Sequence, residues 1–447
     1  DETARDYVLQ TAEDADVKFV RLWFPDILGN LKGFAINAAD LRDAIEEGVG
    51  FDGSAIESYA RSDESDMRAF PDPNTFTLLP WRPQQNAVAR MFCDIQRPGG
   101  ESFGGDSRAV LKRNLEHLAR MGYTYYVGTE LEYFYLKDSG GTKKRKEAKP
   151  LDHGGYFDQL SSQPASDLRR DTVLNLAAMD VPVKYSHHEA APSQHEIDLQ
   201  YTDALAMADS VMTARLVVKE LAQVQGVYAT FMPKPIAGVN GSGMHIHQSL
   251  FQGENNAFFD EDDEHYLSEV GRKFIAGLLR HAPEITVVTN QWVNSYKRLV
   301  PGYEAPAYVS WSHVNRADLV RVPSYKPGYE SSMRVEYRAP DPACNPYLAF
   351  SVMLAAGMKG IQEDYPAPLP IAENAASMSE AQRQALGIKT LPTSLGHAIS
   401  LAEDSELLRE ALGDQIFPSF IQNKRREWGE YCSQVTNYEI EHYLQRL

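Results

Sequence analysis

Polar side chains recur at every second position in the stretch 240–250. After a glycine-rich turn, His245, His247 and Ser249 alternate with apolar or amide side chains. Alternate side chains of a β-strand lie on one face of it, so we expect the two imidazoles and the hydroxyl to point the same way. A strand face packed against a dry core would carry hydrophobic side chains at these positions. The pattern therefore predicts a strand that presents ligand atoms to a site.

The same period of two recurs in three further stretches, 128–134, 187–198 and 334–338. Their charged members are Glu130, Glu132, Glu189, Glu196, Asp198, Arg334, Glu336 and Arg338. Four strands that each carry a charged face cannot all turn that face to solvent in a chain of this size. We therefore expect the four strands to line one shared funnel.

The remaining pattern predicts a small mixed α/β unit followed by a larger one. Helical periodicity predicts helices over 2–14, 41–47, 107–121, 169–179, 204–225, 267–281 and 346–360. Further strands are predicted over 17–24, 32–36, 75–79 and 87–94, with a turn-rich loop over 50–58. The glycine-rich segment 97–105 is the clearest linker, so we predict one domain over 1–105 and another over 106–447. The polar loop 294–306, punctuated by glycine and proline, is typical of a lid.

Composition excludes several classes of partner. The net charge of −18, from 44 basic and 62 acidic residues, argues against nucleic acid or an anionic membrane. The apolar runs are shorter than a membrane span, and the first residues lack the pattern of a signal peptide. The three cysteines lie far apart and are expected to be reduced and buried. We therefore expect a cytoplasmic protein.

Five carboxylates and one imidazole form a candidate metal-ligand set. They are Glu130, Glu132, Glu189, Glu196, Glu336 and His245. Oxygen-rich sets of this kind suit Mg²⁺ or Mn²⁺, and buried carboxylates without cations would repel one another strongly. Two or three ions would neutralise them. The alternative, exposed glutamates paired with lysine, explains any one of them but not four strands together.

Arginines are concentrated in and after the predicted lid. They are Arg298, Arg316, Arg321, Arg334 and Arg338. The guanidinium fork matches phosphate and carboxylate groups, although an ordinary surface role stays open for each arginine singly. Metal ions, arginines and a lid together suggest nucleotide-dependent phosphoryl transfer. The chain has no Walker-type or kinase-type glycine loop, so a nucleotide must be held in another way.

Several ordered motifs resemble those of type I glutamine synthetase, over nearly the whole chain. They are Phe51-Asp-Gly-Ser, Ser65-Asp-Met, Gly154-Gly-Tyr-Phe, His187-His-Glu, Phe231-Met-Pro-Lys-Pro, Asn240-Gly-Ser-Gly-Met-His, 294–306, Asn315-Arg and Asn345-Pro-Tyr-Leu. The resemblance implies an α+β fold with an N-terminal β-grasp domain (1–105) and a catalytic domain (106–447) with a funnel of antiparallel strands surrounded by helices. It also implies a dodecamer of two hexameric rings, with active sites between subunits.

The implied reaction joins L-glutamate and ammonia at the expense of ATP, through γ-glutamyl phosphate. By resemblance, Glu132, Glu189 and Glu196 hold one metal, whereas Glu130, His245 and Glu336 hold a second on the ATP phosphates. The implied glutamate contacts are Asn240, Gly241, Arg298 and Arg338, and the implied nucleotide and phosphate contacts are His247, Ser249, Arg316 and Arg321. Asp52, from the neighbouring subunit, resembles the base that deprotonates ammonium. Glu304 resembles the lid carboxylate, and Tyr156 a wall of the ammonium pocket.

Departures from the family pattern keep other functions open. Ala55 replaces a serine beside the implied ammonium pocket, and Ser58 replaces a nearby glycine. Loss of one hydrogen-bonding group could loosen discrimination against primary amines, so a glutamate–amine ligase is the first alternative. A non-catalytic regulatory homologue is the second, but it predicts eroded metal or lid residues, and none is missing.

Other departures concern regulation. Ala376 stands where adenylylated relatives carry a tyrosine, which predicts no adenylylation. Arg61 resembles the arginine linked to feedback control in the α-type branch. The loop 324–333 lacks the lysine that the family spacing implies, and Lys326 is left out of the predicted site.

Overall fold

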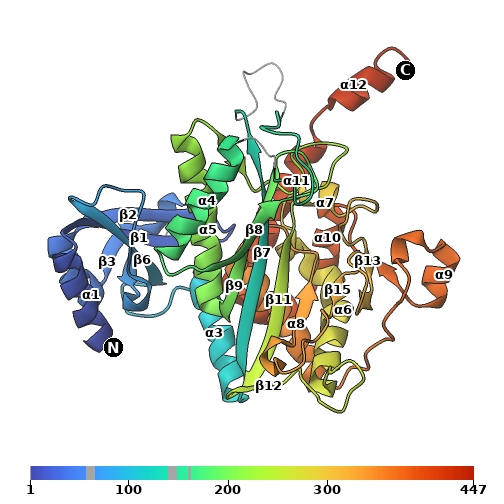
Figure 1. The fold of residues 1–447 in the computed structure, drawn as a ribbon, viewed down its shortest axis with the longest axis horizontal. Coiled ribbons are helices and arrows are strands. Elements are labelled where there is room, and N and C mark those ends of the chain that lie inside the picture. Colours follow the sequence, from blue (N-terminus) through green and yellow to red (C-terminus); the bar gives the residue numbers. More distant parts are fainter. Residues whose placement is uncertain (1, 57–65, 139–147, 160–162) are drawn as a thin grey trace.

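The N-terminal part of the chain is a six-stranded sheet flanked by one long and one short helix (Figure 1). The computed structural model describes residues 2–56, 66–138, 148–159 and 163–447. The sheet has the order β2-β1-β6-β4-β3, with β5 on β6, and only the β1–β6 pair is parallel. Its elements are α1 (Glu2–Asp14), β1 (Val17–Pro25), β2 (Leu31–Asn37), α2 (Leu41–Glu47), β3 (Val49–Asp52), β4 (Asp66–Pro71), β5 (Thr77–Leu78) and β6 (Ala87–Gln96).

The β1–β2 turn docks this part onto the rest of the molecule. The Asp26 carboxylate accepts hydrogen bonds from the backbone N–H groups of Leu28 and Asn30, which closes the turn. Gly29 has φ +77°, and a Cβ there would lie 2.7 Å from the Cα of Asn345. Because only glycine fits this close approach, the turn packs directly against the start of α8 (Pro346–Gln362).

A nine-stranded sheet runs through the larger part (Figure 1). Its order is β14-β15-β16-β11-β7-β9-β8, with β10 on β7 and β12 on β11. All pairs are antiparallel except β14–β15. The strands are β7 (Thr124–Leu136), β8 (Val183–His188), β9 (Gln194–Asp203), β10 (Tyr228–Thr230), β11 (Met244–Gln252), β12 (Asn255–Asn256), β14 (Trp311–Ser312), β15 (Val320–Arg321) and β16 (Val335–Tyr337).

The register of this sheet sets charged residues opposite one another. His245 of β11 pairs with Glu130 of β7, and Glu132 pairs with Glu196 of β9. His247 pairs with Glu336 of β16. Directly opposite residues of neighbouring strands have side chains on the same face. The period-two patterns therefore share one face, as the sequence predicts.

Helices of the larger part complete the core. They are α3 (Ser107–Arg120), α4 (Gln163–Ala177), α5 (Ala204–Val224), α6 (Glu269–Thr289), α7 (Ser295–Arg298), α8, α10 (Leu395–Ala402) and α11 (Glu406–Cys432). The short helix α9 (Glu380–Ala385) has no buried residue and lies away from the sheet (Figure 1). The α6–α8 pair packs backbone to backbone, because a Cβ on Gly277 or Gly360 would lie 2.1 Å from a carbonyl oxygen of the other helix. The last helix, α12 (Asn437–Tyr443), projects away from the body (Figure 1). A small two-stranded sheet joins β13 (Tyr308–Val309) to β17 (Lys389–Thr390).

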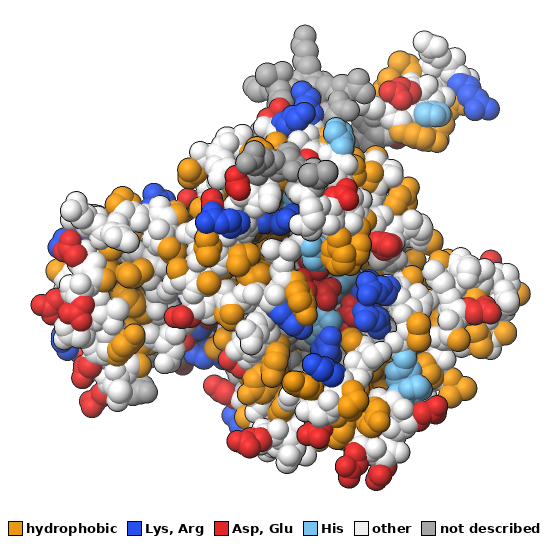
Figure 2. All heavy atoms as spheres, in the orientation of Figure 1, with side chains coloured by type: hydrophobic (Ala, Val, Ile, Leu, Met, Phe, Trp, Pro, Cys, Tyr) orange, Lys and Arg blue, Asp and Glu red, His pale blue; other side chains and the backbone are white. Residues whose placement is uncertain are grey.

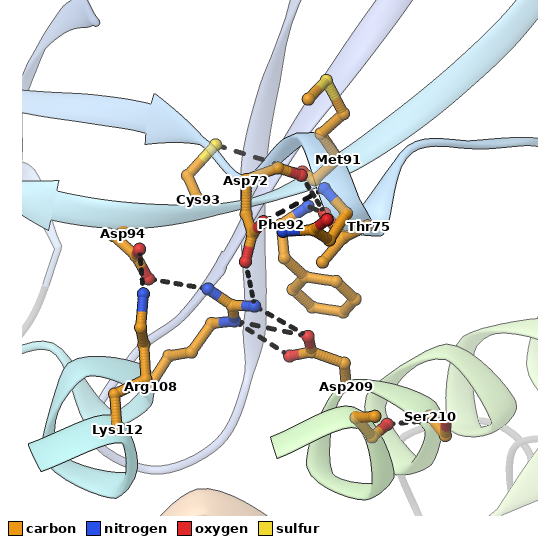
Figure 3. A network of polar contacts seen from close by, with 12 residues as sticks. Asp72, Thr75, Met91, Phe92, Cys93, Asp94, Arg108, Lys112, Asp209 and Ser210 are labelled. Carbon is orange, nitrogen blue, oxygen red and sulfur yellow. Dashed lines mark hydrogen bonds and ion pairs between the residues drawn. The ribbon is translucent and has the colours of Figure 1, made fainter. Parts of the chain in front are cut away.

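A buried arginine joins the two parts of the chain (Figure 3). The Arg108 side chain, 1% exposed, lies at the start of α3. Its guanidinium donates to Asp94 of β6 at 2.6 Å, to Asp72 of the segment after β4 at 2.8 Å and to Asp209 of α5 at 3.0 Å. Lys112 supplies a second cation to Asp94. The network therefore ties the N-terminal sheet to a helix of the larger part.

Four predicted elements differ in the structure, and the first is the helix predicted over 169–179, which begins earlier as α4 (Gln163–Ala177). The helix predicted over 267–281 continues as α6 to Thr289 through Pro283, because buried Ile285, Val287 and Val288 still pack into the core. The strand predicted over 75–79 is reduced to β5, because an Asp72-capped 3₁₀ turn occupies 73–75. The loop predicted over 50–58 begins with strand β3, which pairs with β4.

The cysteine prediction is wrong in one respect, since Cys432 is exposed whereas Cys93 and Cys344 are buried. In the described part of the chain, no helix combines the length and apolarity needed to cross a membrane.

Candidate active site

The charged face of the large sheet opens into a cavity of about 910 Å³. Figure 2 shows red, blue and pale blue side chains gathered at this hollow near the middle of the visible face. All predicted site residues except Asp52 and Ser249 line it, namely Glu130, Glu132, Tyr156, Glu189, Glu196, Asn240, Gly241, His245, His247, Arg298, Glu304, Arg316, Arg321, Glu336 and Arg338. The expected shared funnel is therefore present as geometry, while the role of each residue stays a prediction.

Three glutamates form the first acidic cluster in the cavity. Oxygen atoms of Glu132, Glu189 and Glu196 lie within 4.8 Å of one another. Burial and the neighbouring Glu189 raise the pKa of Glu132 to about 8. Burial, followed by the charge of Glu132, raises the pKa of Glu196 well above its usual range. The chain alone therefore does not balance the negative charge here.

Histidines accompany the carboxylates in the second cluster. Glu130 lies between two imidazoles, with Oε2 2.7 Å from Nδ1 of His245 and Oε1 2.6 Å from Nε2 of His247. The Oε1 atom of Glu336 lies 3.7 Å from Nδ1 of His245. Although burial raises the pKa of Glu130, His247 and His245 outweigh it and hold the pKa well below its usual range. Glu130 is therefore held as a carboxylate.

His247, predicted as a nucleotide contact, lies among the residues of the second cluster. Ligand atoms of Glu130, His247 and Glu336 lie within 4.8 Å of one another. The other ring nitrogen of His247, Nδ1, accepts a hydrogen bond from Nε of Arg334 at 3.1 Å. This contact leaves Nε2 as the atom that faces Glu130.

A third acidic group adjoins the first cluster. Ligand atoms of His187, Glu196 and Asp198 lie within 4.8 Å of one another, so Glu196 belongs to both groups. Burial raises the pKa of Asp198 to about 6. The sequence pattern placed Asp198 on the charged face without indicating a role for it.

Arginines border the acidic clusters on the β16 side. Arg321 donates to Oε2 of Glu336 at 2.9 Å, and Arg338 donates to Oε1 of the same carboxylate. Burial raises the pKa of Glu336, but Arg338, His247 and His245 together outweigh it, so the net shift is downward. Arg316 lies in the cavity wall beside Tyr156. The wall of the cavity thus carries cations as well as carboxylates.

Arg298, predicted as a glutamate contact, is buried and bonded to the backbone. Its side chain is buried, and Nη1 and Nη2 donate to the backbone carbonyls of Ala339 at 2.6 Å and Arg338 at 3.1 Å. A Cβ on Gly243 would lie 2.4 Å from Nη2. Arg298 therefore also supports the glycine-rich turn that carries Asn240.

The Glu304 carboxylate, in the segment predicted to act as a lid, contacts the glycine-rich turn. The Asn240 side-chain amide donates to Oε2 of Glu304 at 2.9 Å. Glu304 has φ +56° and follows Gly302 at φ +92°. Gly241 is needed in the turn, because a Cβ there would lie 2.3 Å from the carbonyl oxygen of Pro233. The lid and the turn are thus in direct contact.

Two predicted residues lie outside this cavity. Asp52 ends strand β3 in the N-terminal sheet, where its exposed carboxylate accepts hydrogen bonds from the N–H and Oγ of Ser54. Ser249 lies two residues beyond His247 on β11, opposite Tyr126 of β7. Ala55 lies beside Asp52, whereas Ser58 and Arg61 fall outside the described residues. Lys326 does not line the cavity.

Gln194 supports the site, although the sequence pattern predicted no role for it. Its buried side-chain amide donates to Glu132 at 3.1 Å and to the carbonyl of Gly241 at 2.9 Å. Gln194 thereby joins an acidic cluster to the glycine-rich turn. It begins β9, two residues before Glu196, so the period-two pattern could have identified it. Arg334 lies on a predicted charged face, and the structure adds its contact with His247 in the cavity.

The donor sets fit hard divalent cations. All are carboxylate oxygens and imidazole nitrogens, which suit Mg²⁺ or Mn²⁺. Burial and repulsion from neighbouring carboxylates raise the pKa values of Glu132 and Glu196, and bound cations would offset both effects.

Comparisons with known proteins cover almost the whole chain. Residues 16–98 match the family model "Glutamine synthetase, beta-Grasp domain" and residues 104–443 match "Glutamine synthetase, catalytic domain". The glutamine synthetase of Mycolicibacterium smegmatis is 52% identical over 98% of this chain and 99% of its own. That of Methanosarcina mazei is 46% identical over 100% and 98%. A solved structure titled as a GmaS/ADP complex is 30% identical, with a TM-score of 0.88 over 98% of this chain and 99% of its own.

Proposed function

The chain belongs to the glutamine synthetase family, and from this premise we propose the reaction and the residues that perform it. The predicted α+β fold, with its β-grasp and catalytic domains, is confirmed by these matches. The reaction is the ATP-dependent ligation of glutamate and ammonia. The glutamate γ-carboxylate attacks the γ-phosphorus of ATP, and ADP leaves. Ammonia then attacks the acyl carbon of γ-glutamyl phosphate, so that the C–N bond forms and phosphate leaves.

One observation carries this proposal. Two acidic clusters, a set of arginines and a lid carboxylate converge in one cavity. Acyl phosphate chemistry needs each of these parts, because it brings two anions together and then must exclude water.

We propose two divalent-cation positions in the cavity. We assign Glu132, Glu189 and Glu196 to one ion, and Glu130, His245 and Glu336 to a second. The group of His187, Glu196 and Asp198 supports a third position. Bound Mg²⁺ or Mn²⁺ would supply neutralisation of the phosphate oxygens and of the glutamate carboxylate.

Arginines and histidines of the chain orient the phosphates. Arg316 and Arg321 both line the cavity, where their guanidinium groups would balance charge spread over the transferring oxygens. His247, with Ser249 two residues beyond it on β11, is assigned to the nucleotide. Arg338 is assigned to the acyl group, and its hydrogen bond to Glu336 orients its guanidinium.

Glutamate and ammonium are assigned to the turn and lid side of the cavity. Asn240, Gly241 and Arg298 are assigned to glutamate, and the hydrogen bond from Asn240 to the lid supports this position. Glu304 would shield the acyl phosphate from water and accept a proton. Tyr156 would form a wall of the ammonium pocket.

Asp52 is assigned as the base that takes a proton from ammonium, acting in the site of a neighbouring subunit. The support is that Asp52 is exposed and does not line the cavity of its own chain. This assignment belongs to a dodecamer of two hexameric rings with shared sites. We also propose a domain boundary between residues 105 and 106, within the segment that joins β6 to α3, and a cytoplasmic location, where ATP is available.

The test compares second substrates. Phosphate release from ATP is measured with glutamate and Mg²⁺, in the presence of ammonium, methylamine, ethanolamine or putrescine. Stimulation by ammonium, with glutamine as the product, is the expected result. Stimulation by an amine alone would replace the proposal with a glutamate–amine ligase, and the absence of any stimulation would favour a non-catalytic homologue.

A further inference from the structure

Lys234 contacts the start of the lid through its backbone. Its N–H donates to Oδ1 of Asn294 at 2.7 Å, and its carbonyl accepts from Nδ2 of the same side chain at 3.1 Å. Asn294 is the residue that precedes α7, where the lid segment begins. A paired amide contact of this kind holds one orientation, because both partners are satisfied at once.

The Lys234 side chain contacts the other end of the lid. Its Nζ lies 3.8 Å from the centroid of the Tyr303 ring and also donates to the backbone carbonyl of Val239. Tyr303 immediately precedes Glu304, and Val239 immediately precedes Asn240. Asn240 in turn donates to Glu304. Lys234, Val239–Asn240 and Tyr303–Glu304 are therefore linked in a ring of contacts, which we call the circuit.

Backbone conformation gives an independent reason for such a circuit. Glu304 is in the left-handed region at φ +56°, which is unfavourable for a residue with a Cβ. Such residues persist where surrounding contacts over-determine them. The circuit supplies two such contacts. Asn240 holds the Glu304 carboxylate, and Lys234 holds the ring of the preceding residue, Tyr303.

Lys234 lies outside the machinery of the reaction. It does not line the cavity. Among the described residues, the contacts of its ammonium group are with the Tyr303 ring and the Val239 carbonyl rather than with a carboxylate. A lysine that served only packing would not need to contact both ends of one loop.

We propose that Lys234 is a positioning residue that holds the lid closed over the acyl phosphate. This inference rests on the proposed function. When the Lys234 ammonium group is removed, Tyr303 is released. Glu304 then samples open positions in which water reaches γ-glutamyl phosphate. Water then attacks γ-glutamyl phosphate, the bond from the acyl group to phosphate breaks, and glutamate, phosphate and a proton are released. ATP is consumed without amide formation.

The test measures phosphate released and glutamine formed in the same reaction. Wild type should release phosphate in only a small excess over glutamine. K234M and Y303L should raise that excess, measured per glutamine formed, about three-fold, the factor expected for losing one partly exposed cation–π contact. K234R and Y303F should stay close to wild type, because they retain the cation and the ring. The double variant K234M/Y303L should resemble either single variant.

A matched control is K219M. Lys219 lies 5.7 Å from the Phe231 ring centroid, so it is also a lysine over an aromatic ring, and that ring lies outside the lid segment. The ratio should be unchanged in this variant. If K234M and Y303L lower turnover while the ratio stays at the wild-type value, the positioning role is overturned.

A second measurement is independent of turnover. Hydrogen exchange of the segment 299–306 should be faster in K234M and Y303L than in wild type and K219M. Unchanged exchange overturns the inference even where the protein is inactive. A wild-type enzyme that makes no glutamine, together with faster exchange in K234M, instead rejects the proposed function and leaves the lid contact supported.

Discussion

Replacing Arg108 by methionine tests the junction between the two parts of the chain. The variant removes the cation that binds Asp72, Asp94 and Asp209, whose side chains are 15%, 26% and 10% exposed. Asp94 keeps Lys112 as a partner, and Asp209 keeps the Tyr347 hydroxyl. Asp72 and Asp209 then lack a directly bound cation, and we expect a loss of about 3–5 kcal/mol in the free energy of unfolding.

The pH dependence of this loss has a definite sign. In the wild type, burial raises the pKa of Asp72, but Arg108, with smaller contributions from the Asn74 N–H and Lys112, outweighs it, and the net pKa is lowered. The folded pKa lies below the unfolded value, so this stability is present above the unfolded pKa and lost as pH falls through the folded pKa. In the variant, burial is opposed only by the Asn74 N–H and by Lys112, so the folded pKa should rise. The difference in the free energy of unfolding between wild type and the Arg108 variant should be largest at neutral pH and shrink below about pH 4.

Urea denaturation followed by tryptophan fluorescence, at one protein concentration, measures the effect. The control is Arg170→Met, because Arg170 is 70% exposed and pairs with the neighbouring Asp171. Its loss should be about 0–1 kcal/mol. A loss below about 1 kcal/mol in the Arg108 variant, or a loss that grows as the pH falls, would refute the reasoning.

Three further predictions concern the cavity. Glu304→Ala should retain ATP binding by calorimetry but lose amide formation, and full synthetase activity in that variant would remove the lid carboxylate from the mechanism. Co-expressing Asp52→Asn and Glu304→Gln subunits should restore about a quarter of the sites in randomly mixed rings, because a site between two subunits is intact when each contributes its unmutated residue. If each site lay within one subunit, every mixture would stay inactive. Glu196→Gln should weaken Mn²⁺ binding by at least roughly 10–100-fold, measured by titration, while exposed Glu116→Gln should leave it unchanged, and equal affinities would exclude Glu196 as a ligand.

Much of the site was predictable because strands have a simple period. Glu130 and Glu132 stand at alternate positions, as do His245 and His247, so the sequence alone indicates that each pair shares a face. The register that sets His245 opposite Glu130 is a tertiary feature. The sequence could not supply it, because pairing depends on which strands become neighbours.

Residues whose role depends on distant partners were harder to identify. Gln194 lies 62 positions from Glu132, and Lys234 lies 60 positions from Asn294. Gln194 shares the period of its strand, but a neutral amide does not stand out among charged ligands. Lys234 lies in an irregular segment, so it carries no periodic signal at all. Contacts over such separations leave no local pattern in a sequence.

The end of helix α6 shows the same limit for secondary structure. The local pattern ended this helix at residue 281, just before Pro283, because proline removes a backbone hydrogen bond. The helix nevertheless continues to Thr289. Burial of Ile285, Val287 and Val288 outweighs the lost bond, and that burial exists only where the helix packs against the rest of the core.

The sequence by itself determined the chemistry of this protein, because the types of side chain and their alternation along strands already indicate carboxylate, imidazole and guanidinium groups on shared faces. Only the tertiary structure decided which of these groups meet. Strand register placed Glu132 opposite Glu196, and the fold placed Asp52 away from the cavity of its own chain. The physical reason is that side-chain direction follows from local backbone geometry, whereas proximity follows from packing between segments far apart in the chain.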